Sequence, residues 1–215
     1  MKKYICLFIV MIFACFNASA QTQKFKDFLR DCEYEIVVGF NAYKATEPFE
    51  EGKLGYNLGV TARKEVTTFM KNKVGVYGLV GLVLTKRGGK TDNDALTLFD
   101  SDKNYVVSGL ALPIHVGGEY KIKKLSLFVD FGPNILFKTS GADFDNISTN
   151  SVTFGGGLNW GIRYKKFALS LGVDTDFTNI GTFKPDDAQM DHLSLTKKTY
   201  NLKTMEAHFL LRWTL

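Results

Sequence analysis

The sequence is poor in cysteine, in long apolar runs and in net charge, and each scarcity excludes a class of protein. Cys32 is the only cysteine after residue 20, so a chain that loses its first 20 residues can form no internal disulfide. Past residue 20, no stretch of about 18 residues is both apolar and uncharged, which argues against a membrane-spanning helix. The mean hydropathy of -0.05 is also too low for a helical membrane protein.

The net charge is small. It is +5 over 215 residues, and removal of residues 1–20 takes away two lysines and no acidic residue, which leaves +3. A charge this mild does not indicate a nucleic-acid partner, and we expect none. Hydrophobic residues make up 45% of the chain, a content that suits a membrane β-barrel because half of each barrel strand is polar.

The N-terminus has the three parts of a secretory signal. Lys2 and Lys3 are positive, residues 4–16 are apolar, and Ala18-Ser19-Ala20 supplies the small residues of a cleavage site. We therefore predict a signal peptide at 1–20, a periplasmic lead-in at 21–32 and an outer-membrane β-barrel at 33–215. The length of the last segment is that of one ordinary domain.

The stretch 202–215 shows the pattern that recurs along this domain. Its residues are alternately apolar and polar, with Leu210 as the one apolar exception on the polar side. Successive side chains of a strand point to opposite faces, so the pattern predicts a strand with one face toward lipid. We expect the barrel-assembly machinery to recognise this C-terminal strand. The apolar side consists of Ala207, Phe209, Leu211, Trp213 and Leu215, and the polar side includes Thr204, Glu206, His208, Arg212 and Thr214.

Seven further stretches alternate in a similar way, which predicts eight strands. They cover residues 33–43, 54–64, 74–85, 105–120, 125–138, 152–164, 167–178 and 202–215. Short connections at 66–73, 121–124 and 165–166 alternate with long polar ones at 45–53, 86–104, 139–151 and 179–199. Bacterial outer-membrane barrels have an even number of strands, long external loops and short periplasmic turns.

These features predict an all-β protein, an eight-stranded antiparallel up-and-down transmembrane β-barrel. We expect it in the outer membrane of a Gram-negative bacterium, with both termini in the periplasm. Pro113 falls within the fourth strand and cannot donate a ladder hydrogen bond, so we expect a bulge or a local break there.

The alternation also assigns a side to each residue of the wall. The polar sides carry charges of both signs, and the interior of an eight-stranded barrel is just wide enough for side chains to fill it. We therefore expect an internal salt-bridge plug rather than a pathway. The predicted lumen network is Glu35, Arg63, Asp130, Arg163, Asp174, Glu206, His208 and Arg212, and Lys138, Asp176 and His115 are assigned to the same side. The residues predicted to face lipid include Phe154, Leu158, Trp160, Phe209, Leu211 and Trp213.

Three short motifs carry a family resemblance. They are Ala111-Leu112-Pro113-Ile114 followed by Tyr120, then Phe131-Gly132-Pro133, then Gly155-Gly156-Gly157. With these motifs, most of the chain after residue 20 resembles the PorT-like outer membrane protein β-barrel domain family. The resemblance implies an eight-stranded barrel without catalytic residues, and some members of that family are tied to protein secretion.

The motifs that could carry chemistry have plainer explanations. Gly88-Gly89-Lys90-Thr91 resembles the end of a phosphate-binding loop, but Leu84 stands where that motif needs glycine, and Gly155-Gly156-Gly157 lies within a strand. The acidic loop residues match no calcium-loop spacing; they are Asp92, Asp94, Asp100, Asp102, Asp143 and Asp145. We expect no catalytic, cofactor-binding or metal-binding residue, and no cofactor.

Three functions follow from this fold. The favoured one is a non-enzymatic outer-membrane protein that acts through its external loops or as part of an envelope or secretion assembly, with lipid and an envelope protein as partners. The second is a lipid-modifying barrel enzyme that would use His192 and Ser194 beside Asp191, although no oxyanion-hole candidate accompanies them. The third is a soluble periplasmic lipid-binding barrel, whose apolar residues would face inward.

Overall fold

The structure is a computed structural model that describes residues 30–46, 52–89, 105–140, 147–185 and 199–215. The predicted signal peptide and most of the predicted lead-in lie outside these residues. The chain divides into two units, 1–33 and 34–215, and the second contains the sheet described below. No helix in the described ranges has the length and apolarity needed to cross a membrane.

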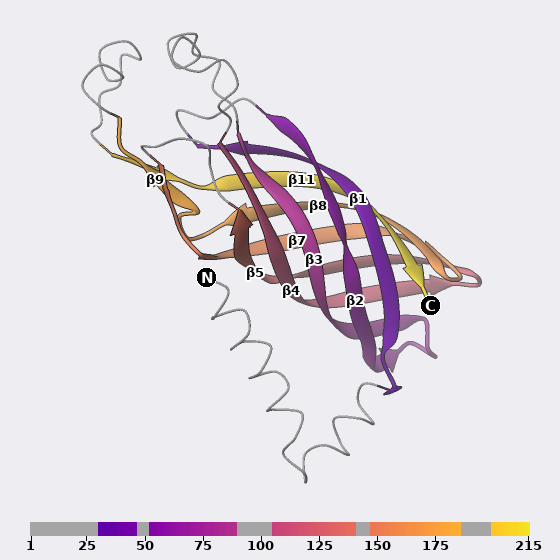
Figure 1. Cartoon of the computed structure of the whole chain (residues 1–215). Helices are drawn as coiled ribbons and strands as arrows, with labels where there is room; N and C mark the ends of the chain where they lie inside the picture. Colours follow the sequence, from indigo (N-terminus) through magenta and orange to yellow (C-terminus); the bar gives the residue numbers. More distant parts are fainter. Residues whose placement is uncertain (1–29, 47–51, 90–104, 141–146, 186–198) are drawn as a thin grey trace. The chain divides into compact units, whose positions relative to one another are not determined.

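Eight long strands close into an antiparallel barrel, which confirms the predicted fold class (Figure 1). Around the barrel their order is β1-β11-β8-β7-β5-β4-β3-β2. Each consecutive pair is therefore joined as an up-and-down hairpin, apart from short strands inserted between them. The bounds are β1 (Glu33–Ala45), β2 (Lys53–Phe69), β3 (Val74–Gly89), β4 (Tyr105–Ile122), β5 (Leu125–Ser140), β7 (Val152–Tyr164), β8 (Phe167–Asp176) and β11 (Thr204–Thr214).

Two strands run at least four residues further than their alternation predicts. β2 continues to Phe69 through a register shift between Glu65 and Thr67, so only residues 70–73 form the turn to β3. The turn places Met70, Lys71 and Asn72 at φ angles of 51°, 56° and 65°, which takes the chain back in few residues. β3 continues to Gly89, into what the sequence predicts to be a long loop.

Pro113 interrupts strand pairing without a bulge. On the β3 side the paired residues are Val80 with Ile114 and Val83 with Ala111, and the pairing skips Leu112 and Pro113 without a change of register. Proline has no backbone N–H to donate, so the ladder loses a bond there. The expected local break is therefore present, and the register shift in β4 lies instead between Ser108 and Gly109.

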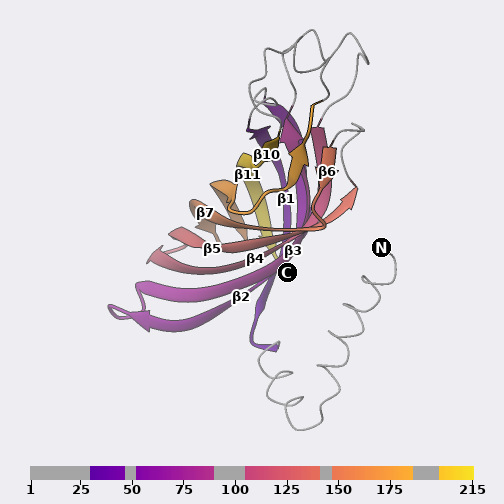
Figure 2. The same ribbon diagram turned by 90° about the vertical axis from the view of Figure 1, so that its left-hand side faces the viewer.

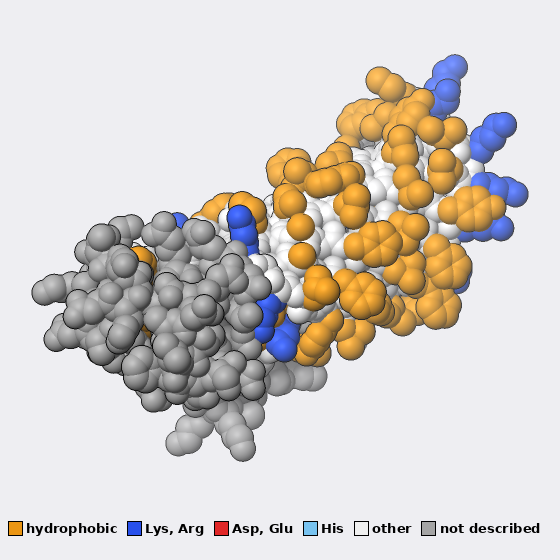
Figure 3. All heavy atoms as spheres, turned by 90° about the horizontal axis from the view of Figure 1, so that it is seen from above, with side chains coloured by type: hydrophobic (Ala, Val, Ile, Leu, Met, Phe, Trp, Pro, Cys, Tyr) orange, Lys and Arg blue, Asp and Glu red, His pale blue; other side chains and the backbone are white. Residues whose placement is uncertain are grey.

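The wall of the barrel has an apolar outer face and a polar inner face. Side chains alternate between exposed and buried over long stretches of the wall, as in β11, where Met205 to Trp213 alternate strictly, although β2 loses the alternation at residues 65–67. Figure 3 shows hydrophobic side chains over the visible part of the wall, and Lys and Arg side chains toward both ends of it. We name the end with the short turns at 70–73, 123–124 and 165–166 the turn end, and the opposite end the loop end.

A small second sheet lies at the loop end, and two of its three strands fall within segments that the sequence predicts to be polar loops. It has the order β10-β9-β6 and consists of β6 (Ile147–Thr149), β9 (Gly181–Phe183) and β10 (Tyr200–Leu202) (Figure 2). The prediction of loops over 139–151 and 179–199 is wrong for β6 and β9, whereas β10 lies at the start of the predicted last strand, which begins at Leu202. Apolar side chains of β9, β10 and the neighbouring Ile180 are buried together with side chains of the barrel wall. The cluster consists of Ala45, Val107, Ala111, Leu136, Ile180, Phe183, Tyr200 and Leu202.

This cluster, which we name the apolar cap, draws on both sheets. Ile180, Phe183 and Leu202 have no exposed surface, and the wall contributes Val107 from β4 and Leu136 from β5. Burying a large aliphatic or aromatic side chain stabilises by about 1.5–3 kcal/mol, so the cap is fixed by packing rather than by its short ladders. The barrel interior is therefore covered at the loop end by ordered apolar residues.

Candidate functional site

The interior of the barrel contains the network that the alternation assigns to it. Seven of the eight predicted residues are buried, with at most 8% of their surface exposed, and Asp174 is half-buried. The structure adds two buried charges that the prediction does not contain, Arg87 and Glu119, and Asp176 and His115 are buried as well. Together these side chains form two groups at different heights in the barrel.

The group nearer the turn end, which we name the balanced cluster, has three carboxylates and three guanidinium groups. It comprises Glu35, Arg63, Glu119, Asp130, Arg163 and Arg212. Arg163 pairs with Glu35 at 2.6 Å and lies 3.7 Å from Glu119, which also pairs with Arg63. Arg212 lies 3.5 Å from Asp130 and 4.0 Å from Glu35. The charges thus cancel within a linked network.

Aromatic rings support the balanced cluster from the wall. The Tyr77 hydroxyl donates to Asp130 at 3.1 Å, and the Arg63 guanidinium lies 4.0 Å from the centre of the same ring. The Phe128 ring lies within 5.7 Å of both Arg163 and Arg212. Desolvated cation–π contacts of this kind are worth about 2 kcal/mol, so these inward rings help to hold the arginines.

The second group, nearer the loop end, has three carboxylates and one guanidinium group. We name it the acid-rich cluster; it comprises Arg87, Asp174, Asp176, Glu206 and His208. Arg87 contacts all three carboxylates: Asp174 at 2.9 Å, Asp176 at 3.1 Å and Glu206 at 2.8 Å. Asp176 is further satisfied by the backbone N–H and hydroxyl of Thr204, and Asn57 donates to Glu206 at 2.9 Å.

Asn159 connects the two clusters. Its amide nitrogen lies 2.8 Å from the Asp130 carboxylate and its amide oxygen lies 2.6 Å from Nε2 of His208. The other lumen histidine, His115, lies 2.8 Å from Asp130 through Nδ1 and 3.0 Å from Asn134 through Nε2. Both nitrogens of His115 therefore have partners, whereas Nδ1 of His208 has no hydrogen bond.

A small cavity of about 50 Å³ opens between the clusters. One water needs roughly 10–15 Å³ measured in this way, so the cavity accommodates a few waters or an ion but no organic substrate of ordinary size. Arg87, Asp174, Glu206 and His208 line it, together with residues of the neighbouring strands. The interior is thus a packed polar network with one small space beside the acid-rich cluster.

The residues predicted to face lipid lie on the outer face. Their exposed fractions run from 40% for Leu158 to 51% for Phe154. The values for Trp160, Phe209, Leu211 and Trp213 lie between these two. Leu210, the apolar exception of the last strand, is buried in the lumen at 8% exposure. The apolar side chains of the wall face outward and the polar ones inward. A soluble lipid-binding barrel with an apolar interior requires the opposite arrangement.

Arg87 is one of the two buried charges that the sequence prediction lacks, and Glu119 is the other. The predicted loop over 86–104 includes Arg87, because the third strand, which is apolar on both faces, is predicted to end at residue 85. The buried side of β3 contains Tyr77, Leu79 and Thr85, and counting on by two reaches Arg87. The strict period of a strand was therefore a signal for this residue.

Lys138, predicted inward, is half-buried and donates to Thr149 of β6 instead.

Several predicted features lie outside the described residues. They are the candidate catalytic residues Asp191, His192 and Ser194, the acidic loop residues from Asp92 to Asp102 and at Asp143 and Asp145, and Lys90 and Thr91 of the phosphate-loop-like motif. Gly88 and Gly89 of that motif end β3. In the described part of the chain, neither histidine is hydrogen-bonded to a serine.

The fold is similar to solved small outer-membrane barrels. The outer membrane enzyme PagL superimposes with a TM-score of 0.52 at 10% identity, covering 85% of this chain and 99% of PagL. Neisserial surface protein A gives a TM-score of 0.45 at 8% identity, covering 85% and 97% of the two chains. OprG from Pseudomonas aeruginosa gives 0.43 at 10% identity, covering 86% and 96%.

These likenesses concern the fold alone. No family model matches the chain, and no curated protein matches its sequence. Nothing in the comparisons identifies the PorT-like family, which remains a prediction from the sequence. Because one of the similar structures is an enzyme, the fold does not decide whether this chain is one. What the structure and the comparisons establish together is that this chain has the eight-stranded barrel fold of small outer-membrane proteins.

Proposed function

We propose that the protein is a closed, non-enzymatic outer-membrane barrel that holds its loop end at the bacterial surface for an envelope or secretion partner. The observation that carries this proposal is the filled interior. Two linked charge clusters cross the lumen, and the apolar cap covers the loop end. A barrel built in this way is a rigid anchor, and its function lies in the surfaces that it presents.

The lengths of the connections support one orientation. The turn end bears exposed lysines, among them Lys71, Lys123, Lys165 and Lys166, on turns of a few residues. Short turns lie on the periplasmic side in bacterial barrels, and long connections lie outside. We therefore place the turn end and both termini in the periplasm and the loop end outside.

The resemblance to the PorT-like family supports the choice of partner. That family is tied in part to protein secretion, which favours an envelope protein over a diffusible ligand. The cavity of about 50 Å³ also argues against a bound organic substrate inside the barrel. Folding into the membrane would require recognition of the last strand, β11, by the barrel-assembly machinery.

A lipid-modifying enzyme is the second candidate, and the specific observation in its favour is the similarity to the outer membrane enzyme PagL. The histidines of the described residues do not support it, because His115 and His208 are buried in the lumen, away from lipid. His192 and Ser194 therefore carry this hypothesis. His192→Ala and Ser194→Ala should leave the biological activity unchanged if the protein is an anchor and abolish it if the protein is an enzyme.

The proposal is tested by fractionation and by electrical recording of the full chain. We expect the protein to stay with the outer membrane through extraction with salt and alkali, and to give no stable current in planar bilayers. Recovery in the soluble periplasmic fraction would contradict the membrane location. A stable ohmic current would show that the charge clusters and the apolar cap do not close the barrel.

A further inference from the structure

The acid-rich cluster contains more negative than positive charge, and its described neighbours do not balance it. Three carboxylates meet the single guanidinium of Arg87, whereas the balanced cluster matches three with three. Burying negative charge that no cation balances is costly, so a buried group with excess negative charge recruits a cation or a proton. We propose that Asp174, Glu206 and His208 bind a divalent transition-metal cation inside the barrel.

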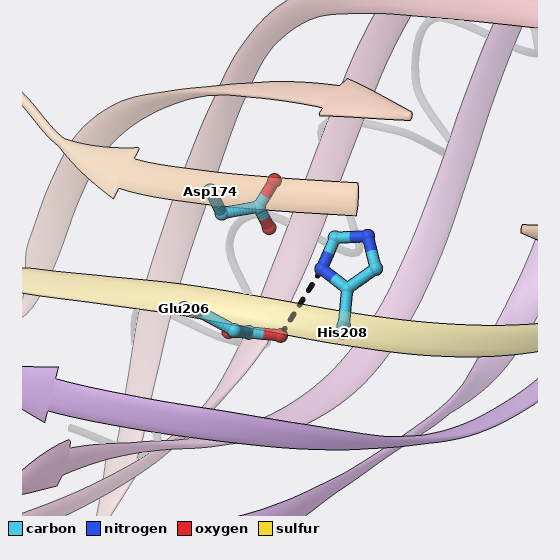
Figure 4. Close-up of side chains that lie close together, drawn as sticks. All are labelled: Asp174, Glu206 and His208. Atoms are coloured by element: carbon cyan, nitrogen blue, oxygen red, sulfur yellow. Dashed lines mark ion pairs between the residues drawn. The ribbon is translucent and has the colours of Figure 1, made fainter. Parts of the chain in front are cut away.

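The strand register places these three side chains together. Asp174 of β8 and Glu206 of β11 are direct partners in the ladder, and His208 follows two residues along on the same inner face. Like charges directly opposite each other across a strand pair destabilise it. One potential ligand atom from each of the three residues lies within 4.8 Å of the others, and Figure 4 shows the three side chains converging. A cation between them converts a repulsive cross-strand pair into an attractive one.

The hydrogen bonds of Asn159 fix the tautomer of His208. The Asp130 carboxylate only accepts, so the Asn159 amide nitrogen faces it and the amide oxygen faces His208. Nε2 of His208 must then carry a hydrogen to donate across 2.6 Å. In the neutral ring this leaves the lone pair on Nδ1, and that atom faces Glu206 Oε1 at 3.5 Å with no hydrogen bond. Metal-bound histidines are oriented by such a bond from their second nitrogen.

The carboxylates keep oxygen atoms free for a metal. Arg87 contacts Oδ2 of Asp174 and Oε2 of Glu206. Oδ1 of Asp174 is buried and has no hydrogen-bond partner at all, and Oε1 of Glu206 accepts one bond, from Asn57. A carboxylate oxygen has two lone pairs, so both of these atoms can still bind a cation. Arg87 therefore holds the two carboxylates in place from one side without using up their ligand capacity.

Glycines and the cavity provide the space. A Cβ on Gly172 would clash with Nε2 of His208, and one on Gly157 would clash with Oδ1 of Asp174, so the glycines leave room for these two ligand side chains. All three ligand residues line the cavity of about 50 Å³, which leaves room for the ion and a water. One imidazole and two carboxylates suit Zn²⁺, Fe²⁺ or Mn²⁺ better than Ca²⁺, which prefers oxygen ligands alone.

The test is zinc binding by the full chain, without an affinity tag, folded in detergent micelles and stripped with a chelator. We expect one Zn²⁺ for each chain, and X-ray absorption that reports nitrogen and oxygen ligands without sulfur. His208→Gln should weaken zinc binding more than ~100-fold, beyond the 10–100-fold that loss of an outer-shell partner costs. The near-isosteric change Asp174→Asn provides a second variant should His208→Gln fail to fold.

His115→Gln is the matched control. His115 is also a buried lumen histidine lining the same cavity, but both its nitrogens have partners in Asp130 and Asn134. It should bind zinc as the unaltered protein does. Absence of stoichiometric zinc in the unaltered protein would overturn the proposal. Equal loss in His208→Gln and His115→Gln would also overturn it, because the metal would then not be held by the residues named.

Discussion

The balanced cluster and the acid-rich cluster occupy one lumen but differ in how their charges are balanced. In the balanced cluster each carboxylate meets an arginine, and the aromatic rings of Tyr77 and Phe128 complete the environment. In the acid-rich cluster a single arginine, Arg87, contacts three carboxylates, and two buried ligand atoms have no hydrogen bond. The difference teaches that matched charges are enough to fill a small barrel. A buried group whose carboxylates outnumber its arginines instead indicates a site for a cation.

The largest effect is expected from removing the one cation of the acid-rich cluster. Arg87→Met leaves three buried carboxylates facing one another, and removal of one partner of a buried pair costs about 3–5 kcal/mol, so we expect about 5 kcal/mol here. The measurement is urea unfolding in lipid vesicles. Lys86→Met removes a charge from the neighbouring residue, which points away from the lumen, and should change stability by at most about 1 kcal/mol. If both variants lose the same unfolding free energy, the contacts of Arg87 in the acid-rich cluster contribute no more to stability than Lys86 does.

A smaller loss is expected in the balanced cluster, where neighbouring charges can share partners. Glu35→Gln leaves Arg163 and Arg212 without that carboxylate, but each lies within 4.0 Å of another one, so we expect about 3 kcal/mol in the same unfolding measurement. Glu65→Gln breaks the exposed pair with Lys121 and should cost no more than about 1 kcal/mol. A larger loss from Glu35→Gln than from Arg87→Met would reverse the comparison between the clusters.

The outer face of the last strand provides a third test, which sets the lumen against the lipid. Leu211→Arg places a charge on the outer face, where arginine near the membrane midplane costs about 2–4 kcal/mol. Leu210→Arg, one residue away, enters the lumen and should be milder, although Gly39 packs closely beside Leu210. Folding titrations in bilayers compare the two. Greater damage from Leu210→Arg would contradict the assignment of the outer face to lipid.

The smallest change is expected from Asp174→Asn in the absence of metal. It removes one of the repelling carboxylates but weakens a contact to Arg87, so the two effects offset and stability should shift by less than about 1 kcal/mol. At zinc a hundredfold above its dissociation constant, the unaltered protein should gain about 2.7 kcal/mol and the variant should gain none. Thermal or urea unfolding with and without zinc measures both values. If zinc stabilises the variant as much as the unaltered protein, zinc does not bind at this cluster.

Sequence alone located the long strands well and the small sheet at the loop end not at all. Val152–Tyr164 was predicted residue for residue, because a period of two over thirteen residues is a strong local signal. β6, β9 and β10 have three residues each, too few for a period to appear. Ile180, Phe183 and Leu202 stand among polar neighbours, and only packing against Val107 and Leu136 makes them a core.

The sequence by itself determined which side of the wall each strand residue occupies, because the direction of a side chain follows from its position in the strand and requires no knowledge of the partner strand. It therefore predicted the charges of the lumen, including Glu35, Asp130 and Arg212. Only the tertiary structure decided which charges meet. Arg87 contacts Asp174 and Glu206 from residues 87 and 119 positions away, because closure of the barrel fixes the register of strands distant in the chain. The charge imbalance of the acid-rich cluster arises from that register and is visible in no single strand.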